Sequence, residues 1–230
     1  MAQSVSVLGQ EVRLPVEVRV ARSAAATFVV PHGAAARLMA GTGLEPKRLP
    51  GGRALCILAA VEYVDNDLGP YNEVAMCLAV GTREGAPPGA YIHQLPVDGE
   101  FTLAAGREVW GFPKWMAEIT IAADERGLRC HLAQDGELIL DLHVRRRPLP
   151  LPSRPAEMSA YARIDGVTRV TPFTSRVTGG RGGPLGATLT VGDRHPMARD
   201  LRSLGLPRRP LMSTTLANMA ATFGPARPLT

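Results

Sequence analysis

Cysteine is scarce in this chain of 230 residues, and its three positions, Cys56, Cys77 and Cys130, are odd in number and widely spaced. That pattern argues against a disulfide framework or a zinc knuckle and favours a reducing compartment. Long apolar runs are absent too, since none approaches the roughly 20 residues that a membrane-spanning helix needs. The first residues lack a basic segment followed by an apolar one, so no secretory signal is expected. We therefore expect a cytoplasmic protein that does not cross a membrane.

Aromatic residues make up only 5% of the chain, and the basic residues behind its net charge of +5 are scattered, apart from short arginine runs at 145–147 and 208–209. Proteins that bind nucleic acid cluster their basic residues and often stack bases on aromatic rings, so no nucleic-acid partner is expected. Lysine is rarer still, because 24 of the 26 basic residues are arginine and only Lys47 and Lys114 remain. Arginine stays protonated, whereas a buried lysine can lose its proton and act as a nucleophile. A lysine retained in such a composition is therefore a candidate functional group.

Regular alternation of strand and helix patterns is also missing, which argues against a doubly wound parallel sheet. Twenty prolines and 24 glycines divide the chain into short pieces that favour strands. Two segments have the composition and boundary residues of helices, at 32–40 and 210–223. We predict a single domain over residues 1–230, of α+β class, mostly antiparallel β with a few peripheral helices. The predicted strands lie at 12–20, 54–64, 73–80, 90–97, 117–123, 161–171 and 185–192, with a hairpin over 128–145 that turns at Asp135-Gly136.

Motifs for metals, phosphates and hydrolases have little support. The five histidines show no metal-binding spacing, so no metal site is expected. The glycine-rich segment 179–183 could bind an anion through successive backbone N–H groups, but it matches no nucleotide-binding motif and is interpreted as a flexible connection. A serine hydrolase lacks its anchor, because no Gly-x-Ser-x-Gly elbow occurs.

The segment 106–115 (GREVWGFPKW) stands apart, because it gathers both tryptophans, one phenylalanine and one of the two lysines. One interpretation is that Lys114 lies at the surface and extends its charged end over an aromatic turn. The other is that Lys114 lies in an apolar pocket, where desolvation disfavours the ammonium form. A neutral amine attacks ketones to form a Schiff base, and the resulting iminium withdraws electrons from the neighbouring carbon. Loss of CO₂ or cleavage of a C–C bond then becomes feasible.

The same segment resembles the active-site segment of the acetoacetate decarboxylase family, which reads roughly Gly-Arg-Glu-x-x-(Gly/Ala)-(Tyr/Phe)-Pro-Lys. Segment 68–73 (LGPYNE) resembles the family's Tyr-x-Glu segment, and segments 91–93 and 193–198 fall where similar stretches occur. The resemblance runs from about residue 26 to the end of the chain. It implies an antiparallel β-cone or barrel with peripheral helices, one of them C-terminal, and a homo-oligomer.

By this resemblance Lys114 is the Schiff-base lysine and Glu73 the carboxylate that positions substrate or moves protons. Phe112 forms a wall of the apolar pocket, Tyr71 belongs to the substrate site, and Arg22 is the candidate for binding a substrate carboxylate. The implied function is that of a cofactor-independent Schiff-base lyase, most directly the decarboxylation of a small keto acid.

Two positions differ from typical decarboxylases of the family. The lysine that usually follows the first one is replaced by Trp115, which we include among the candidate substrate-binding residues. The second acidic position, about 15 residues before Glu73, is Leu58. Glu62 lies four residues further on, shares a strand face with Leu58 and is a candidate replacement. Two alternatives therefore stay open: aldol condensation, dehydration or cyclisation of a keto acid on the same lysine, and non-catalytic binding of a small molecule on this scaffold.

Overall fold

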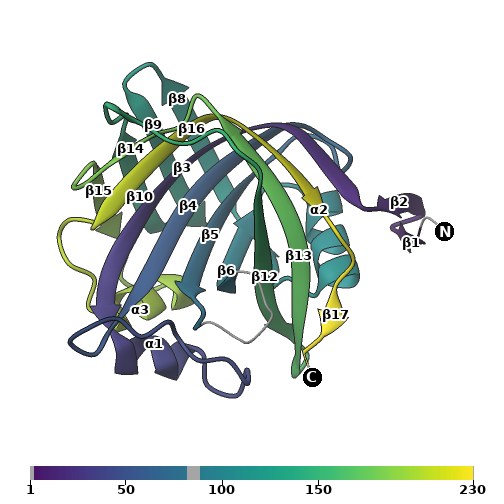
Figure 1. Cartoon of the computed structure of the whole chain (residues 1–230). Helices are drawn as coiled ribbons and strands as arrows, with labels where there is room; N and C mark the ends of the chain where they lie inside the picture. Colours follow the sequence, from purple (N-terminus) through teal and green to yellow (C-terminus); the bar gives the residue numbers. More distant parts are fainter. Residues whose placement is uncertain (1–2, 82–88, 230) are drawn as a thin grey trace.

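The computed structural model of the chain describes residues 3–81 and 89–229. Within these residues, seven strands close into a barrel, because β16 pairs with both β3 and β13 (Figure 1). Neighbouring barrel strands are antiparallel except β6 and β12, which are parallel. In the order in which they pair around the barrel, the strands are β16 (Met212–Phe223), β3 (Val16–Pro31), β4 (Arg53–Asn66), β5 (Tyr71–Ala79), β6 (Gly89–Val97), β12 (Ala156–Ile164) and β13 (Val167–Thr178).

A second sheet packs outside the barrel, against the wall that β3, β4 and β5 form (Figure 1). Its order is β15 (Ala187–Val191), β10 (Glu137–Arg145), β9 (Gly127–Gln134) and β8 (Glu118–Asp124). The main hydrophobic core lies between this sheet and the barrel wall, and includes Phe28, Leu58, Met76, Leu132 and Leu140. Most of the apolar surface that stabilises the fold is therefore buried outside the barrel.

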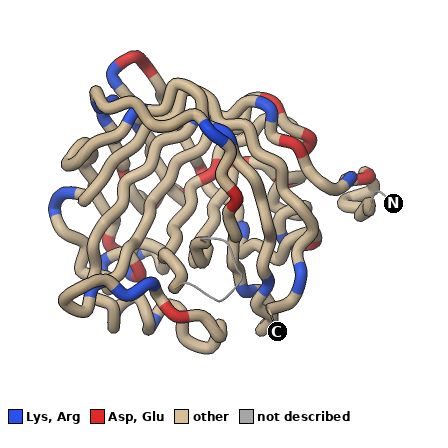
Figure 2. Tube along the Cα trace, in the orientation of Figure 1, with Lys and Arg blue, Asp and Glu red and all other residues tan. Residues whose placement is uncertain are grey.

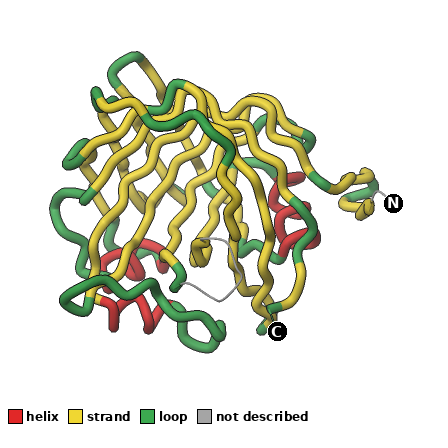
Figure 3. Tube along the Cα trace, in the orientation of Figure 1, coloured by secondary structure: helices red, strands yellow, loops and turns green. Residues whose placement is uncertain are grey.

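Short elements complete the fold. The helices are α1 (His32–Leu38), α2 (Glu100–Ala105), which continues into the π-helical turn η1 (Gly106–Trp110), and α3 (Pro196–Ser203). The remaining strands are β1 (Gln3–Val7), β2 (Gln10–Leu14), β7 (Lys114–Met116), β11 (Leu149–Pro150), β14 (Arg181–Gly183) and β17 (Arg227–Pro228). Figure 3 shows how little of the molecule is helical. No helix in the described part of the chain has the length and apolarity to cross a membrane.

The central strands are apolar on both faces because both faces are covered. Along β4, Leu58 and Ala60 belong to the core between the sheets, whereas Ala59, Val61 and Tyr63 face the barrel interior. Successive side chains of a strand point to opposite faces, so a two-sided strand has a nearly continuous apolar sequence. This explains the uninterrupted run ALCILAAV at 54–61.

The predicted class and architecture are confirmed, as are the helix at the start of segment 32–40 and the hairpin between β9 and β10. That hairpin turns on two residues, Asp135 and Gly136, with positive φ values of 51° and 72°, because Gln134 pairs with Glu137. Two residues with positive φ match the twist of the flanking strands, as the Asp-Gly signal indicates.

Three local predictions were wrong. Segment 210–223 is not a helix but β16, because pairing with β3 and β13 closes the barrel and outweighs the helix propensity of its alanine, leucine and methionine. Segment 161–171 is not one strand, since the chain reverses at Asp165-Gly166 between β12 and β13. Segment 179–183 is not simply a flexible connection, because Arg181–Gly183 forms β14 and pairs with β16.

Candidate active site

Lys114 lies at the start of β7, where the chain leaves η1 and enters the barrel. Gly111 ends η1 with a φ of 68°, in the left-handed region that favours glycine, and three residues later β7 pairs in parallel with β6 at Leu95. Gly106 packs directly on the lysine side chain, since a Cβ atom there would lie 2.7 Å from Lys114 Cε. The side chain is thereby confined, and the residue is only 4% exposed.

The amine of Lys114 has two polar partners from different elements. Its Nζ lies 2.9 Å from Glu73 Oε2 on β5 and donates a hydrogen bond of 2.8 Å to Thr102 Oγ1 on α2. It also sits 4.8 Å from the centre of the Tyr71 ring, within the range of a cation–π contact. Glu73 is itself only 6% exposed, so both members of this ion pair are buried. Removal of either side chain would leave the other without a partner in the protein interior, which is costly.

Two tyrosines complete the surroundings of Glu73. The Tyr63 hydroxyl donates a 3.2 Å hydrogen bond to Glu73 Oε1, and the Tyr63 and Tyr71 rings stack with their centres 4.4 Å apart. Burial raises the pKa of both phenols well above the usual value, and the negative charge of Glu73 raises each pKa further. Both hydroxyls therefore stay protonated, and Tyr63 remains a hydrogen-bond donor to the carboxylate.

These groups face a cavity of about 240 Å³ inside the barrel, with walls from all seven barrel strands and from the segment around Lys114. Six of the eleven aromatic residues in the chain line it. The tubes in Figure 2 show few charged positions along the middle of the barrel strands. The lining residues are Val16, Val18, Ser23, Ala59, Val61, Tyr63, Asn66, Leu68, Tyr71, Glu73, Ala75, Cys77, Ala90, Ile92, Leu95, Trp110, Phe112, Lys114, Met158, Ser159, Ala160, Phe173, Met219 and Phe223.

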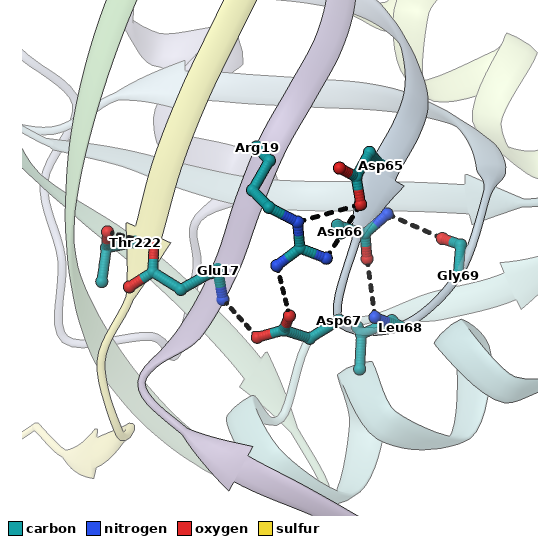
Figure 4. A network of polar contacts seen from close by, with 8 residues as sticks. All are labelled: Glu17, Arg19, Asp65, Asn66, Asp67, Leu68, Gly69 and Thr222. Atoms are coloured by element: carbon teal, nitrogen blue, oxygen red, sulfur yellow. Dashed lines mark hydrogen bonds and ion pairs between the residues drawn. The ribbon is translucent and has the colours of Figure 1, made fainter.

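A polar network fixes the β4–β5 turn, which contributes Asn66 and Leu68 to the cavity wall. Arg19 on β3 donates to Asp65 Oδ1 at 2.9 Å and to Asp67 Oδ1 at 2.6 Å, so it binds the carboxylates on both sides of Asn66 (Figure 4). Within the turn, the Leu68 N–H donates to Asn66 Oδ1 at 2.8 Å. The amide of Asn66 is thus engaged in holding the turn.

Cys77 also lines the cavity, on the same strand as Glu73. Burial raises the pKa of its thiol to about 12, and the charge of Glu73 contributes in the same direction. The thiol is therefore protonated at neutral pH and is a poor nucleophile. No group of three or more His, Cys, Asp or Glu side chains within residues 3–81 and 89–229 is placed to hold a metal ion.

Four of the seven residues predicted for the site meet at the cavity: Lys114, Glu73, Phe112 and Tyr71. The structure thus brings together two segments about 40 residues apart, the Tyr-x-Glu segment on β5 and the Pro-Lys segment before β7. Phe112 stacks on Trp110 with ring centres 5.6 Å apart, so both rings belong to one aromatic wall.

The other three, Arg22, Glu62 and Trp115, do not line the cavity. Arg22 and Glu62 are register partners on β3 and β4 and form an ion pair of 3.0 Å on the face away from the barrel interior. Trp115 follows Lys114 and therefore points to the opposite side of β7, where it stacks on His195 and donates to Gln94 Oε1 at 3.0 Å. Glu62 does share a face with Leu58, as predicted, but that face belongs to the core.

Sequence reasoning missed Thr102, Tyr63 and the walls from β12, β13 and β16. A signal for Tyr63 did exist, because it pairs with Tyr71 across β4 and β5 and follows Val61 in the alternation toward the interior. Thr102 had no such signal, since its contact with Lys114 depends on how α2 folds back over β7.

A closed, mostly antiparallel barrel with an outer sheet, and a buried lysine–glutamate pair facing an apolar cavity, define the class of this protein. A family model described as acetoacetate decarboxylase matches residues 9–224, and the chain belongs to that family. No curated protein sequence matches the chain.

Solved structures of this class share the fold at low sequence identity. Acetoacetate decarboxylase from Legionella pneumophila is 18% identical with a TM-score of 0.72, over 94% of this chain and 87% of that one. The enduracididine biosynthesis enzyme MppR complexed with pyruvate is 20% identical with a TM-score of 0.65, over 94% and 90%. An acetoacetate decarboxylase-like enzyme from Sphingomonas wittichii RW1 is 17% identical with a TM-score of 0.66, over 96% of each chain. These similarities confirm the predicted fold.

Proposed function

We propose that this chain is a cofactor-independent Schiff-base enzyme in which Lys114 attacks the carbonyl carbon of a small keto acid. The observation that carries the proposal is the buried amine of Lys114, held 2.9 Å from Glu73 at the wall of an apolar cavity. A surface lysine would not need a carboxylate, a threonine hydroxyl and a glycine to fix its position. The interpretation of Lys114 as a surface side chain does not fit an exposed fraction of 4%.

Glu73 is placed to move the protons of imine formation. A protonated Lys114 must release a proton before its nitrogen can attack, and Glu73 Oε2 is within hydrogen-bond distance to accept it. Attack gives a carbinolamine, and the same proton can return to its hydroxyl group, which leaves as water while the iminium forms. Tyr63 then stabilises the renewed carboxylate through its hydrogen bond to Glu73 Oε1.

The iminium carries the chemistry that follows. In a β-keto acid, the bond to the carboxylate carbon breaks, its electron pair enters the enamine, and CO₂ leaves. Protonation of the enamine carbon and hydrolysis of the iminium then release the ketone and free Lys114. Decarboxylation is the first proposal for this chain because the family has that chemistry in its name.

A second candidate is aldol-type condensation, dehydration or cyclisation on the same lysine. It is favoured by two departures from typical decarboxylases of the family, since Trp115 takes the place of the second lysine and Leu58 that of the second acidic residue. Structures of MppR include one with the condensation product of pyruvate and imidazole 4-carboxaldehyde, so the fold accommodates such a molecule.

Borohydride trapping tests the proposal directly. The protein is incubated with acetoacetate, pyruvate or acetone, reduced, digested and mapped by mass spectrometry. We expect the adduct on Lys114. Lys47→Arg is the matched control, because it changes the only other lysine, which is exposed, and it should trap normally. Lys114→Met should not trap. The absence of an adduct on Lys114 with every carbonyl, in folded protein, would favour the non-catalytic binding alternative.

Product analysis separates the two reactions. Release of CO₂ from acetoacetate supports decarboxylation, whereas an adduct that forms without release of CO₂ supports the condensation chemistry. Homo-oligomeric assembly and cytoplasmic location stay predictions from the sequence, to be tested by light scattering and by fractionation of the producing cells.

A further inference from the structure

The cavity is larger than a small keto acid requires. An apolar protein cavity of about 150 Å³ binds benzene, which has six carbon atoms. In proportion, the cavity of about 240 Å³ found here has room for a ligand of about ten non-hydrogen atoms. A three- or four-carbon keto acid would fill only part of that space. Four alanines in the wall, at positions 59, 75, 90 and 160, leave the room that larger side chains would occupy.

One wall of the cavity is aromatic and consists of Trp110, Phe112, Phe173 and Phe223. Phe173 stacks on Phe223 at 5.0 Å between ring centres, and Trp110 meets Phe223 edge-on at 6.1 Å. The indole N–H of Trp110 donates to the Gly224 carbonyl at 2.9 Å, so its one polar atom is satisfied within the protein. This wall therefore presents apolar surface and ring faces.

No charged side chain among the described lining residues is left to pair with a charge on that part of a ligand, and the serines that line the cavity, Ser23 and Ser159, are neutral. Glu73 and Lys114 are the only Asp, Glu, Lys or Arg among the described lining residues, and they bind each other. An additional charge in an apolar cavity without a partner is costly. The group bound against the aromatic wall must therefore be uncharged.

We propose that the carbonyl substrate carries an uncharged apolar group of about the size of a phenyl ring, either aryl or branched alkyl, which binds against the aromatic wall while Lys114 attacks the carbonyl. This inference rests on the proposed Schiff-base function, because it places the carbonyl at Lys114. It assigns Trp110, Phe112, Phe173 and Phe223 as specificity-determining residues, with Ala160 as a small residue that packs beside them and leaves room for the group.

Matched ligand pairs test the proposal. Acetone is compared with benzylacetone, and acetaldehyde with phenylacetaldehyde, because both benzyl compounds match the size of the cavity. Burial of a phenyl group is expected to lower the concentration for half-maximal trapping on Lys114 by about 10- to 100-fold within each pair. Equal values for both members of each pair would overturn the proposal, even if trapping itself succeeds.

A variant without the amine keeps this test separate from the Schiff-base function. Lys114→Met cannot form an imine, but its cavity retains the aromatic wall, so benzylacetone should still raise its melting temperature more than acetone does. If wild-type protein traps no carbonyl yet Lys114→Met binds benzylacetone, the Schiff-base proposal fails. The inference that the cavity binds an apolar group of about the size of a phenyl ring is then still supported. If neither protein distinguishes benzylacetone from acetone, the inference fails.

Filling the cavity is the complementary test. Ala160→Leu places a larger side chain beside the aromatic wall and should abolish the advantage of the benzyl compounds while acetone still traps. Ala156→Leu, at an exposed position of the same strand β12, is the matched control and should keep the advantage. If Ala160→Leu does not fold, Phe173→Ala, which enlarges the same space, should weaken binding of the benzyl compounds. An unchanged preference in a folded variant of either kind would contradict the proposal.

Discussion

Substitution of Gly106 by alanine should disable Lys114 without touching any polar group of the site. The backbone at Gly106 is helical, with φ −60° and ψ −40°, so alanine adopts it without strain. The new Cβ, however, would lie 2.7 Å from Lys114 Cε and 3.2 Å from Cγ. Non-bonded carbon atoms prefer about 3.5–4.0 Å, so the lysine chain must move by about 1 Å.

That displacement sets the expected magnitude. The hydrogen bonds of Nζ, now 2.9 Å to Glu73 and 2.8 Å to Thr102, would lengthen or break. A misplacement of about 1 Å at a reacting group can cost about 100-fold in rate. Alanine stabilises a helix interior by up to about 1 kcal/mol relative to glycine, while overpacking costs about 1–3 kcal/mol. Gly106→Ala should therefore stay folded, with a small loss of stability.

The assay is the rate of borohydride trapping on Lys114 with acetoacetate and with benzylacetone, alongside thermal unfolding. We expect a fall of about 100-fold in Gly106→Ala. Gly33→Ala is the matched control, because Gly33 lies in α1 and the nearest atom to its Cβ would be 4.0 Å away on Arg37. Trapping at the wild-type rate in a folded Gly106→Ala variant would refute the claim that this glycine positions the lysine.

Three further outcomes are expected. Glu73→Gln should slow turnover by about 100-fold or more while an imine on Lys114 can still be trapped, because the amide cannot exchange protons; unchanged turnover would remove Glu73 from the mechanism. Cys77, whose pKa burial and Glu73 raise to about 12, should react with Ellman's reagent at pH 8 only after denaturation, and rapid labelling mapped to Cys77 in folded protein would contradict its protonated state. Burial lowers the pKa of His195 below 6.5, and its Nδ1 accepts a hydrogen bond from the N–H of Met197 at the start of α3. The unfolded state therefore binds more protons than the folded state at acidic pH. As a result, the free energy of unfolding falls as the pH drops below about 6.5. His195→Asn, which retains a capping side chain, should reduce that fall in urea titrations between pH 7 and 5, and equal slopes in both proteins would refute the assignment.

Lys114, the central residue of the site, could be predicted from the sequence for a chemical reason. Lys114 was conspicuous because lysine is rare here and because aromatic residues surround it, and these are the features that a buried amine needs. Glu73 came from the family resemblance, since one glutamate among many carries no signal of its own. Thr102 was out of reach, because only the fold of α2 over β7 brings its hydroxyl to the amine.

The wrong predictions about the site arose because successive residues of a strand point to opposite faces of the sheet. Counting back from Glu73 leads to Leu58, but a shift of one residue changes the face, and Ala59 rather than Leu58 lines the cavity. Irregular pairing of β3 with β4 near Val18 and Ala21 makes such counting unsafe for Arg22 as well. The helix expected at 210–223 failed for a related reason, because only the closure of the barrel decides that this segment is a strand.

The placement of the main core has an evolutionary consequence. In a simple closed barrel, the side chains that point inward also hold the protein together, so a change in ligand endangers the fold. Here β3, β4 and β5 pack one face against the outer sheet and leave the other face to the cavity. Selection can therefore alter residues that meet the substrate while those that secure the fold stay constant. A barrel of this kind can acquire a new substrate by single substitutions without first acquiring extra stability.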